Sequence, residues 1–385
     1  MADRPACDVL ILAHVEIPEA GPAALLRVCG VPLIERAIRL ATASAAARIS
    51  VSCGHDDVAM HARALGAEIV PIPGDSSAGA AAAIEAYLAR SGDTVSAVVV
   101  VLDVGACLLE PGDLGGIERA RAETGADSAV AVVPVTGPTW RMDGNGRAGA
   151  VVVEAATAGG GSDVMDAGIL YVSSREGLRL TGQCVHGRTA LHPIPSERSL
   201  CVRTRADRDA AEARLLSSRR RDLSARLPER PAALVMDFDG VFTDNKVLVD
   251  ETGREAVRCD RSDGLGLERL RAAGLPLMVL SKERNPVVQA RCGKLKLECL
   301  QGIDDKRPAL ERWCRERNLD IRSVIFIGND INDVPCLEAA GCAVAVADAY
   351  DAAIHAADIV LDRPGGAGAL RELADLILDR LARVR

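Results

Sequence analysis

The sequence predicts an α/β protein of two domains, each built on a sheet whose strands alternate with helices along the chain. The chain has 385 residues, which is enough for two domains of ordinary size. Short runs rich in β-branched residues alternate with amphipathic, alanine-rich segments, a pattern typical of βαβ units and parallel sheets. The alternation stops in a charged, arginine-rich stretch before residue 231 and then starts again.

The first half of the chain supplies the first series of elements. Strands are expected at 9–14, 48–53, 68–72 and 97–104, with helices at 32–45, 56–65 and 79–90. Three further strands, joined by glycine-rich turns, are expected at 128–135, 150–155 and 168–174. A charged helix at 207–225 then leads into a linker. The sequence therefore predicts an N-terminal domain with a mixed sheet over 1–216 and a linker over 217–230.

The second series starts after Pro231. A strand ends in the DFDG motif at 237–240, and the turn-rich segment 241–260 is expected to be a β-hairpin with its tip at 251–253. Helices are expected at 263–273, 286–294, 305–318 and 333–340 and from 368 onward, with strands at 275–281, 298–302, 323–329, 344–347 and 359–361. This order predicts a doubly wound parallel sheet over 231–385.

The composition limits the kinds of partner. The net charge is −8 and the pI is about 5.4, so a small-molecule ligand is expected and neither a nucleic acid nor a membrane surface is. No apolar run is long enough to span a membrane and the first residues lack the features of a secretion signal, so a cytoplasmic location is expected. The twelve cysteines form no CxxC pair and are expected to be reduced thiols.

Polar side chains directly follow the strands of the second series, where ligands of parallel sheets bind. Asp237 and Asp239 stand at positions i and i+2 after the first strand. Paired carboxylates can share a divalent cation and divide a phosphoryl transfer, one attacking phosphorus and the other handling the leaving-group proton. Ser281 follows the next strand and can hold a phosphoryl oxygen. Lys306, near the start of a helix, can offset charge in the transition state.

A fourth position completes this set. The segment GNDINDVP at 328–335 follows the strand VIFI and carries Asn329, Asp330 and Asp333, whose oxygens suit a hard cation such as magnesium. Each motif alone has an ordinary structural explanation, because a DxD pair is commonly a solvated turn and a single serine or lysine is commonly on the surface. Their shared placement at strand ends predicts one site.

The four motifs together resemble the haloacid dehalogenase superfamily. The resemblance implies that Asp237 attacks phosphorus to form a phosphoaspartate, that Asp239 is the general acid and base, and that Ser281 and Lys306 hold the phosphoryl group. It also implies a Mg²⁺ ion bound by Asp237, the main-chain carbonyl of Asp239 and the 328–335 segment.

Within that superfamily, the closer resemblance is to phosphatases of 3-deoxy-octulosonate 8-phosphate and nonulosonate 9-phosphate, over about 232–380. It rests on the segments DFDGVFTDN, LSKERNPVV, QGIDDK, GNDINDVPCLE and GGAGALRE. It implies a domain without a large cap, a sugar-acid phosphate as substrate, and a homotetramer formed through this domain, in which a neighbouring subunit helps to close the site. It places Asp263, Gly264, Arg371 and Glu372 near the sugar acid.

The first half resembles the cytidylyltransferases that activate sialic acid, over about 7–215. The resemblance rests on GVPLIERAI at 30–38, DAGILYV at 166–172 and SERSL at 196–200. The chemistry of that family is missing, because the first loop carries glutamates and no cation between residues 5 and 26 and would repel a triphosphate. Cys201 and Arg203 stand where the family has two metal-binding aspartates, and neither replaces a carboxylate ligand of magnesium. A catalytically degenerate domain is therefore expected.

Several points stay open at this level. Family members commonly carry an acid where this chain has Asn329, so weakened magnesium binding is expected. The leading hypothesis is hydrolysis of a nonulosonate 9-phosphate, such as that of sialic acid or deaminated sialic acid. A CMP-sugar synthetase with an atypical site and a non-catalytic scaffold or regulator are the alternatives. The sequence does not decide which sugar acid is used or whether the N-terminal domain binds a nucleotide.

Overall fold

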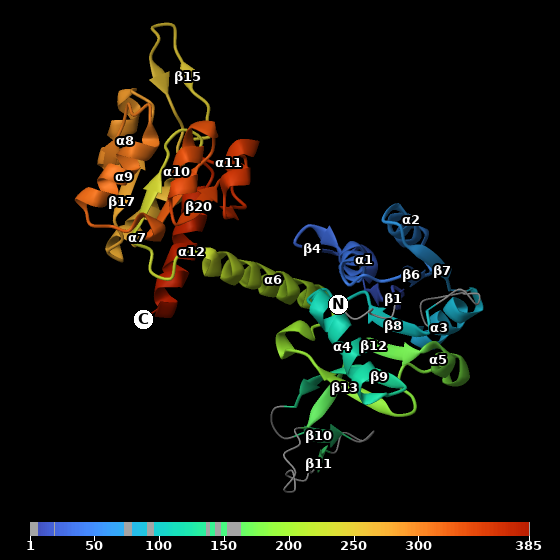
Figure 1. Cartoon of the computed structure of the whole chain (residues 1–385). Helices are drawn as coiled ribbons and strands as arrows, with labels where there is room; N and C mark the ends of the chain where they lie inside the picture. Colours follow the sequence, from blue (N-terminus) through green and yellow to red (C-terminus); the bar gives the residue numbers. More distant parts are fainter. Residues whose placement is uncertain are drawn as a thin grey trace, which may run out of the picture. The chain divides into compact units, whose positions relative to one another are not determined.

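The computed structural model describes residues 7–18, 20–72, 79–90, 96–135, 139–142, 148–151 and 163–384, without the side chains of 139–142, 148–151 and Val384. The chain divides into two compact units, Met1–Leu216 and Ser217–Arg385 (Figure 1). Most of the strand expected at 150–155 lies outside the described residues. In the described ranges, no helix is long and apolar enough to cross a membrane.

A mixed sheet forms the centre of the first unit. Among the described residues it has seven strands, in the order β13-β9-β12-β8-β1-β6-β7. They are β1 (Asp8–Leu12), β6 (Arg48–Cys53), β7 (Glu68–Pro71), β8 (Val98–Asp103), β9 (Ser128–Pro134), β12 (Val164–Ser174) and β13 (Thr189–Pro193). β12 is antiparallel to both of its neighbours, and the other pairs are parallel. Short antiparallel pairs join β2 (Glu16–Ile17) to β3 (Gly21–Pro22), β4 (Arg27–Val28) to β5 (Val31–Pro32), and β10 (Thr139–Met142) to β11 (Ala148–Val151).

Helices cover both faces of this sheet because its central strands are apolar on both faces. Along β1, Val9 and Ile11 belong to one buried core, whereas Leu10 and Leu12 belong to another. The first core includes residues of α1 (Leu33–Ala43), α2 (Asp56–Ala64) and α4 (Pro111–Thr124), and the second includes residues of α3 (Gly79–Arg90) and α5 (Arg175–Thr181). The alternation of side chains along one strand thus divides the core of the unit in two.

The second unit is built on a parallel sheet. In the described part of the chain it has six strands, in the order β18-β17-β14-β19-β20-β21. They are β14 (Ala233–Met236), β17 (Leu277–Leu280), β18 (Glu298–Leu300), β19 (Val324–Gly328), β20 (Cys342–Ala345) and β21 (Ile359–Val360). A hairpin of β15 (Leu248–Val249) and β16 (Glu255–Ala256) extends beyond the sheet, as expected from the sequence (Figure 1).

Local sequence signals set the starts of several helices in this unit. Asp260 and Asn285 each accept a hydrogen bond from a backbone N–H of the first turn that follows, and a proline opens the second of these helices. The helices are α7 (Arg261–Ala272), α8 (Pro286–Leu295), α9 (Lys306–Glu316), α10 (Val334–Ala339), α11 (Asp351–Ala356) and α12 (Ala369–Val384). Each follows a strand or the hairpin, as the predicted alternation requires.

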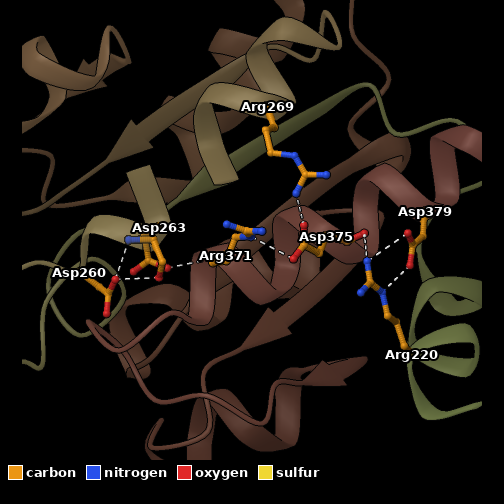
Figure 2. Close-up of polar contacts among 8 residues, drawn as sticks. Arg220, Asp260, Asp263, Arg269, Arg371, Asp375 and Asp379 are labelled. Atoms are coloured by element: carbon orange, nitrogen blue, oxygen red, sulfur yellow. Dashed lines mark hydrogen bonds and ion pairs between the residues drawn. The ribbon is translucent and has the colours of Figure 1, made fainter. Parts of the chain in front are cut away.

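The division between the units falls inside a helix, α6 (Arg205–Arg226). Its last turns belong to the second unit and contact α12. Arg220 pairs with Asp379 (Figure 2). Ser224 Oγ donates a hydrogen bond to the carbonyl of Leu376 at 3.3 Å. The segment expected as a linker over 217–230 is therefore helical as far as Arg226.

The strand order of the second sheet reverses at β14. The chain passes from β14 to β17 and β18 on one side, and then to β19, β20 and β21 on the other. Ligands of such sheets bind beyond the carboxyl ends of the strands at this reversal. The residues that directly follow β14, β17 and β19 are Asp237, Ser281 and Asn329. The predicted fold class is confirmed, and it brings these three side chains to one edge of the sheet.

Candidate active site

Lys306 lies between two buried carboxylates at this edge. Its side chain, at the first residue of α9, is 1% exposed. Its Nζ is 2.6 Å from Asp237 Oδ1 and 2.6 Å from Asp333 Oδ1. Both distances are those of charge-assisted hydrogen bonds. The ammonium group therefore joins the end of β14 to the turn that follows β19.

This group of charges has more negative than positive members. Burial and the neighbouring Asp333 raise the pKa of Asp237 to about 8, against the opposing effect of Lys306. Burial also disfavours the charge of Lys306, but the two carboxylates raise its pKa above its ordinary value. A further positive charge beside Asp237 would favour the ionised form, which is the form that can attack phosphorus.

Asp333 also organises the turn after β19. Its Oδ2 accepts hydrogen bonds from the backbone N–H groups of Asn329, at 3.0 Å, and Asp330, at 3.3 Å. Asp330 Oδ1 accepts a hydrogen bond from the N–H of Ile331 at 2.6 Å. Both oxygens of Asp333 thus hold other groups of the site, and the metal-ligand role of Asp330 and Asp333 stays a prediction.

Asn329 lies against the loop that carries both predicted catalytic aspartates, residues 237–244, which we call the catalytic loop. Asn329 is 4% exposed, and a Cβ added to Gly240 would be 2.0 Å from its Nδ2. Gly240 also has a φ of +78°. The DFDG turn therefore requires glycine both for its backbone conformation and for the close approach of the amide.

Asp239 is half-buried next to other acids. Burial, followed by the charge of Glu283, raises the pKa of Asp239 above its ordinary value, while Lys306 acts in the opposite direction. A carboxyl group with a raised pKa keeps its proton closer to neutral pH. This is the property required of a group that protonates a leaving oxygen.

Ser281 is fully buried at the end of β17. Its N–H donates a hydrogen bond to the carbonyl of Leu300 at 2.9 Å, and its Oγ accepts one from the N–H of Glu283 at 3.0 Å. Because the Oγ is the acceptor in the second bond, its own proton can be donated to a phosphoryl oxygen. The structure thus places all four predicted catalytic residues on elements that meet at one edge of the sheet.

A loop far along the sequence supports the catalytic loop, and sequence reasoning missed this role. The N–H of Gly366 donates a hydrogen bond to the carbonyl of Val241 at 3.0 Å. A Cβ on Gly365 would be 2.0 Å from the carbonyl oxygen of Gly240, and one on Gly366 would be 2.6 Å from the backbone nitrogen of Asp244. Only glycine permits so close an approach of two backbones. The single sequence signal was the glycine pair itself, which does not name its partner.

Two of the residues predicted near the sugar acid hold helices together (Figure 2). Asp263 is 1% exposed and its Oδ1 accepts a hydrogen bond from the N–H of Arg371 at 2.8 Å, in the first turn of α12. Burial raises the pKa of Asp263 to about 6. The Nε of Arg371 lies 3.0 Å from Asp375, which also pairs with Arg269 of α7. These contacts join α12 to α7.

The other two predicted substrate contacts also have structural surroundings. Glu372 accepts hydrogen bonds from the N–H groups of Asp362, at 3.1 Å, and Arg363, at 3.0 Å. A Cβ on Gly264 would be 3.1 Å from the side chain of Leu295. In the described part of the chain, no hydrogen bond joins these four residues to the predicted catalytic ones. Their contact with a substrate stays a prediction.

The donor atoms at the edge of the sheet suit a hard cation. The neighbouring strand ends present the carboxylates of Asp237 and Asp239 and the amide of Asn329, all oxygen donors of the kind that magnesium prefers. Within the described ranges, no three side chains of the His, Cys, Asp and Glu types form a metal-binding group, so Asp237, Asp330 and Asp333 do not make one by themselves.

Comparison with known families matches both units. A family model described as haloacid dehalogenase-like hydrolase matches residues 290–372, and a second, described as MobA-like NTP transferase domain, matches residues 20–229. The 3-deoxy-D-manno-octulosonate 8-phosphate phosphatases of Salmonella typhi and Escherichia coli K12 are each 32% identical over 146 residues, which is 38% of this chain and 78% of each relative.

Solved structures similar to this chain include two phosphatase-like proteins. A Streptomyces avermitilis protein assigned to the HAD hydrolase family is 50% identical, over 40% of this chain and 88% of that one, with a TM-score of 0.39. The 3-deoxy-D-manno-octulosonate 8-phosphate phosphatase of Moraxella catarrhalis, in complex with magnesium, phosphate and KDO, is 26% identical over 41% of this chain and 91% of that one, with a TM-score of 0.40.

Removal of the buried cation tests the arrangement around Lys306. We expect Lys306→Met to lower the free energy of unfolding by about 3–5 kcal/mol at pH 7, because the acids Asp237 and Asp333 remain buried without their cationic partner. The raised pKa of Asp237 means that the folded state binds more protons than the unfolded state between about pH 4 and pH 8, so stability falls as pH rises through this window. The loss should therefore shrink towards pH 4.

Urea unfolding of the metal-free protein, followed by the fluorescence of Trp313 on α9 in a Trp140→Phe background, measures this loss. The adjacent Arg307→Met is the matched control, because Arg307 pairs with Glu311 on the surface and should cost only about 0.5 kcal/mol. Equal losses for the two variants would contradict the buried-cation arrangement.

Substitution of Gly365 tests the support of the catalytic loop. We expect Gly365→Ala to lower kcat for phosphate release from p-nitrophenyl phosphate about 100-fold, because the new methyl group displaces the carbonyl of Gly240 and with it the reacting carboxylates. KM should change much less. Gly293→Ala, where the methyl group meets no atom within 4 Å, should leave both constants unchanged. A Gly365→Ala enzyme with normal kcat would show that the contact does not position the site.

Proposed function

The chain belongs to the haloacid dehalogenase-like hydrolases through its C-terminal unit and to the MobA-like NTP transferase domains through its N-terminal unit, and we propose that it hydrolyses a nonulosonate 9-phosphate. The C-terminal unit is a phosphoric monoester hydrolase. The single observation that carries the proposal is the Lys306 ammonium group 2.6 Å from Asp237, at the point where the strand order reverses. The proposed nucleophile Asp237 and proton donor Asp239 both follow β14, and the proposed cation Lys306 opens α9.

In the proposed reaction a carboxylate oxygen of Asp237 attacks phosphorus. A bond forms between this oxygen and phosphorus, the bond from phosphorus to the sugar oxygen breaks, and Asp239 gives its proton to the departing oxygen. Asp239, now ionised, takes a proton from a water molecule, whose oxygen attacks the phosphorus of the phosphoaspartate. Orthophosphate leaves and Asp237 is restored.

The surrounding residues hold the phosphoryl group. Lys306 presents a buried positive charge to the developing negative charge, in a site that excludes water. Ser281 donates its hydroxyl proton to a phosphoryl oxygen. Gly365, against the carbonyl of Gly240, and the amide of Asn329 support the turn that carries both aspartates. These groups are positioned by the strand ends, by α9 and by the loop of Gly365 before substrate binds, so little reorganisation accompanies the proposed reaction.

We further propose that the enzyme uses Mg²⁺. Asp237, the main-chain carbonyl of Asp239 and Asn329 would hold the ion, with Asp330 and Asp333 as further predicted ligands. Magnesium would supply positive charge to the phosphoryl oxygens. The excess of negative charge that raises the pKa of Asp237 supports this, because a dication there would favour the ionised nucleophile. The amide of Asn329 in place of an acid is expected to weaken the affinity.

The choice of a sugar acid rests on two features of the chain. The curated relatives that match the C-terminal unit are phosphatases of an eight-carbon sugar acid. The N-terminal unit resembles enzymes that activate nine-carbon sugar acids, and the fusion of the two units favours the nine-carbon substrate. Asp263, Gly264, Arg371 and Glu372 are the proposed contacts to the sugar acid. We propose a cytoplasmic location, which the expectation of reduced thiols for the twelve cysteines supports.

We propose that the enzyme is a homotetramer, assembled through the C-terminal unit. The β15–β16 hairpin carries Val247, Leu248 and Val249, which are 49%, 74% and 61% exposed. Three adjacent exposed apolar side chains at the end of a short hairpin are unfavourable in water and support contact with another subunit. A neighbouring subunit at this hairpin would also help to close the site.

A substrate panel tests the proposed reaction. With Mg²⁺, we expect orthophosphate release from a nonulosonate 9-phosphate with a kcat/KM at least about 100-fold above that for 3-deoxy-octulosonate 8-phosphate and hexose 6-phosphates, since a sugar-acid site discriminates through contacts remote from phosphorus. EDTA and Asp237→Asn should each abolish release. The control Asp320→Asn, on the surface, should not alter it. Equal rates across the panel would reject the substrate but retain the phosphatase, whereas release by Asp237→Asn would reject the mechanism.

Light scattering coupled to size-exclusion chromatography tests the assembly. We expect the wild-type chain to elute at four times its 40.4 kDa mass and Leu248→Asp to elute as smaller species, because a buried unpaired charge would destabilise the contact. Leu180→Asp changes a residue of the N-terminal unit that is 73% exposed and should remain tetrameric. A tetramer that survives Leu248→Asp would remove the hairpin from the interface.

A further inference from the structure

The end of strand β8 in the N-terminal unit carries a polar cluster that the phosphatase does not use. Asp103 is the last residue of β8, and Leu12 of β1 pairs with both Asp103 and Ser52. Asp103 therefore lies at the carboxyl ends of three adjacent parallel strands, where sheets of this class bind their ligands. Its side chain is 12% exposed.

Every oxygen of this carboxylate already has a partner within the chain. Asp103 Oδ2 accepts a hydrogen bond from Arg203 Nη2 at 2.9 Å. Asp103 Oδ1 accepts hydrogen bonds from the N–H of Gly105, at 2.8 Å, and from Cys201 Sγ, at 3.3 Å. Cys201 and Arg203 are the two residues that stand where the sequence resemblance places metal-binding acids. In the structure both residues contact the carboxylate of Asp103, which could itself have been a metal ligand.

The residues of this cluster do not fit a divalent cation. A guanidinium group has no lone pair to offer a metal and repels it, and it holds the Asp103 oxygen that would be a ligand. Burial and Asp103 raise the pKa of Cys201, so its thiol keeps its proton and is not a ligand at neutral pH. His14, two residues after the end of β1, has a buried Nδ1 with no hydrogen-bond partner in the described part of the chain, but one imidazole does not make a magnesium site.

We infer that Arg203 takes the place of the divalent cation in the N-terminal unit, so that the unit binds no metal at Asp103 and the pair serves as a structural joint. Arg203 lies two residues before the start of α6, and its backbone N–H donates a hydrogen bond to Asp207 Oδ2 at 3.1 Å. Thr204 Oγ1 donates to the same oxygen at 2.8 Å. Arg203 thus connects the edge of the sheet, through its guanidinium group, to the first turn of α6, through its backbone.

The first loop of the unit offers no substitute for the missing metal. Between residues 5 and 26 the sequence has no lysine or arginine, and Glu16 pairs with His55. Enzymes that transfer a group from a nucleoside triphosphate bind it together with a divalent cation, which offsets the negative charge of the phosphates. Without that cation, and with acids in the loop, a metal-assisted transfer from a nucleoside triphosphate has no support in this unit. The inference holds whatever the C-terminal unit binds.

Counting of bound Mn²⁺ on the full chain tests this inference, with electron paramagnetic resonance as the signal. The Cys201→Asp/Arg203→Asp double variant should bind one Mn²⁺ per chain more than the wild type, because three carboxylates then face one another. Asp103→Asn should bind the same number as the wild type, since Asp103 holds no metal. The test compares the number of bound Mn²⁺ ions per chain between each variant and the wild type. Any Mn²⁺ bound by the C-terminal unit is present in both and does not affect this difference.

The controls separate a site from a change of net charge. Arg203→Lys keeps a cation beside Asp103 and should match the wild type, and Arg208→Asp adds acid on the surface of α6 and should also match it. Loss of one Mn²⁺ in Asp103→Asn would overturn the inference, as would a folded double variant that binds no extra ion. Because Asp103→Asn preserves the shape of the side chain, that arm decides the question even where the double variant fails to fold.

Discussion

The buried ammonium group of Lys306 is the interaction on which the catalytic edge of the C-terminal sheet depends. Two carboxylates that would otherwise repel each other are drawn to within hydrogen-bond distance of one nitrogen. One of them, Asp333, then uses its second oxygen to hold the turn after β19. Lys306, on α9, thus helps to position Asn329 through Asp333. Asn329 in turn packs against Gly240.

The catalytic loop is held from two sides by backbone and amide groups and not by flexible side chains. Asn329 fills the space on one side of Gly240, and Gly365 fills the space on the other. Close-packed surroundings of this kind leave the two aspartates few alternative positions, which is the condition for a nucleophile and a proton donor to act in sequence on one phosphorus atom. The strands and glycines set the geometry of the site, and four side chains carry the proposed chemistry.

The sequence predicts local structure well where periodicity is strong. The helix at 79–90 and the hairpin tip at 251–253 agree with the structure, and Asp237, Ser281 and Asn329 directly follow strands as expected. α4, at Pro111–Thr124, was missed because a proline and three glycines lower its helix propensity and its apolar face is short. Its stability comes from tertiary contacts and a capping box, as the burial of Leu114 and Ile117 indicates.

Long-range contacts were the other limit of prediction. The hydrogen bond between Asp263 and the N–H of Arg371 joins residues 108 positions apart, so no local pattern identifies Asp263 as the group that begins α12. The same holds for Gly365 against the carbonyl of Gly240. Asp333 shows a related difficulty. The GNDIND segment predicts that Asp333 is a metal ligand. In the structure, Lys306 of α9 forms an ion pair with Asp333 Oδ1, and no local sequence pattern indicates this contact.

The ion pair between Arg203 and Asp103 has a consequence for how the chain responds to its surroundings. The occupancy of a metal site depends on the concentration of the free metal ion in the cell. An arginine side chain is present once in every chain. Starvation for divalent ions would leave the joint at the start of α6 intact. In the N-terminal unit, a side chain of the polypeptide itself therefore supplies the positive charge beside Asp103.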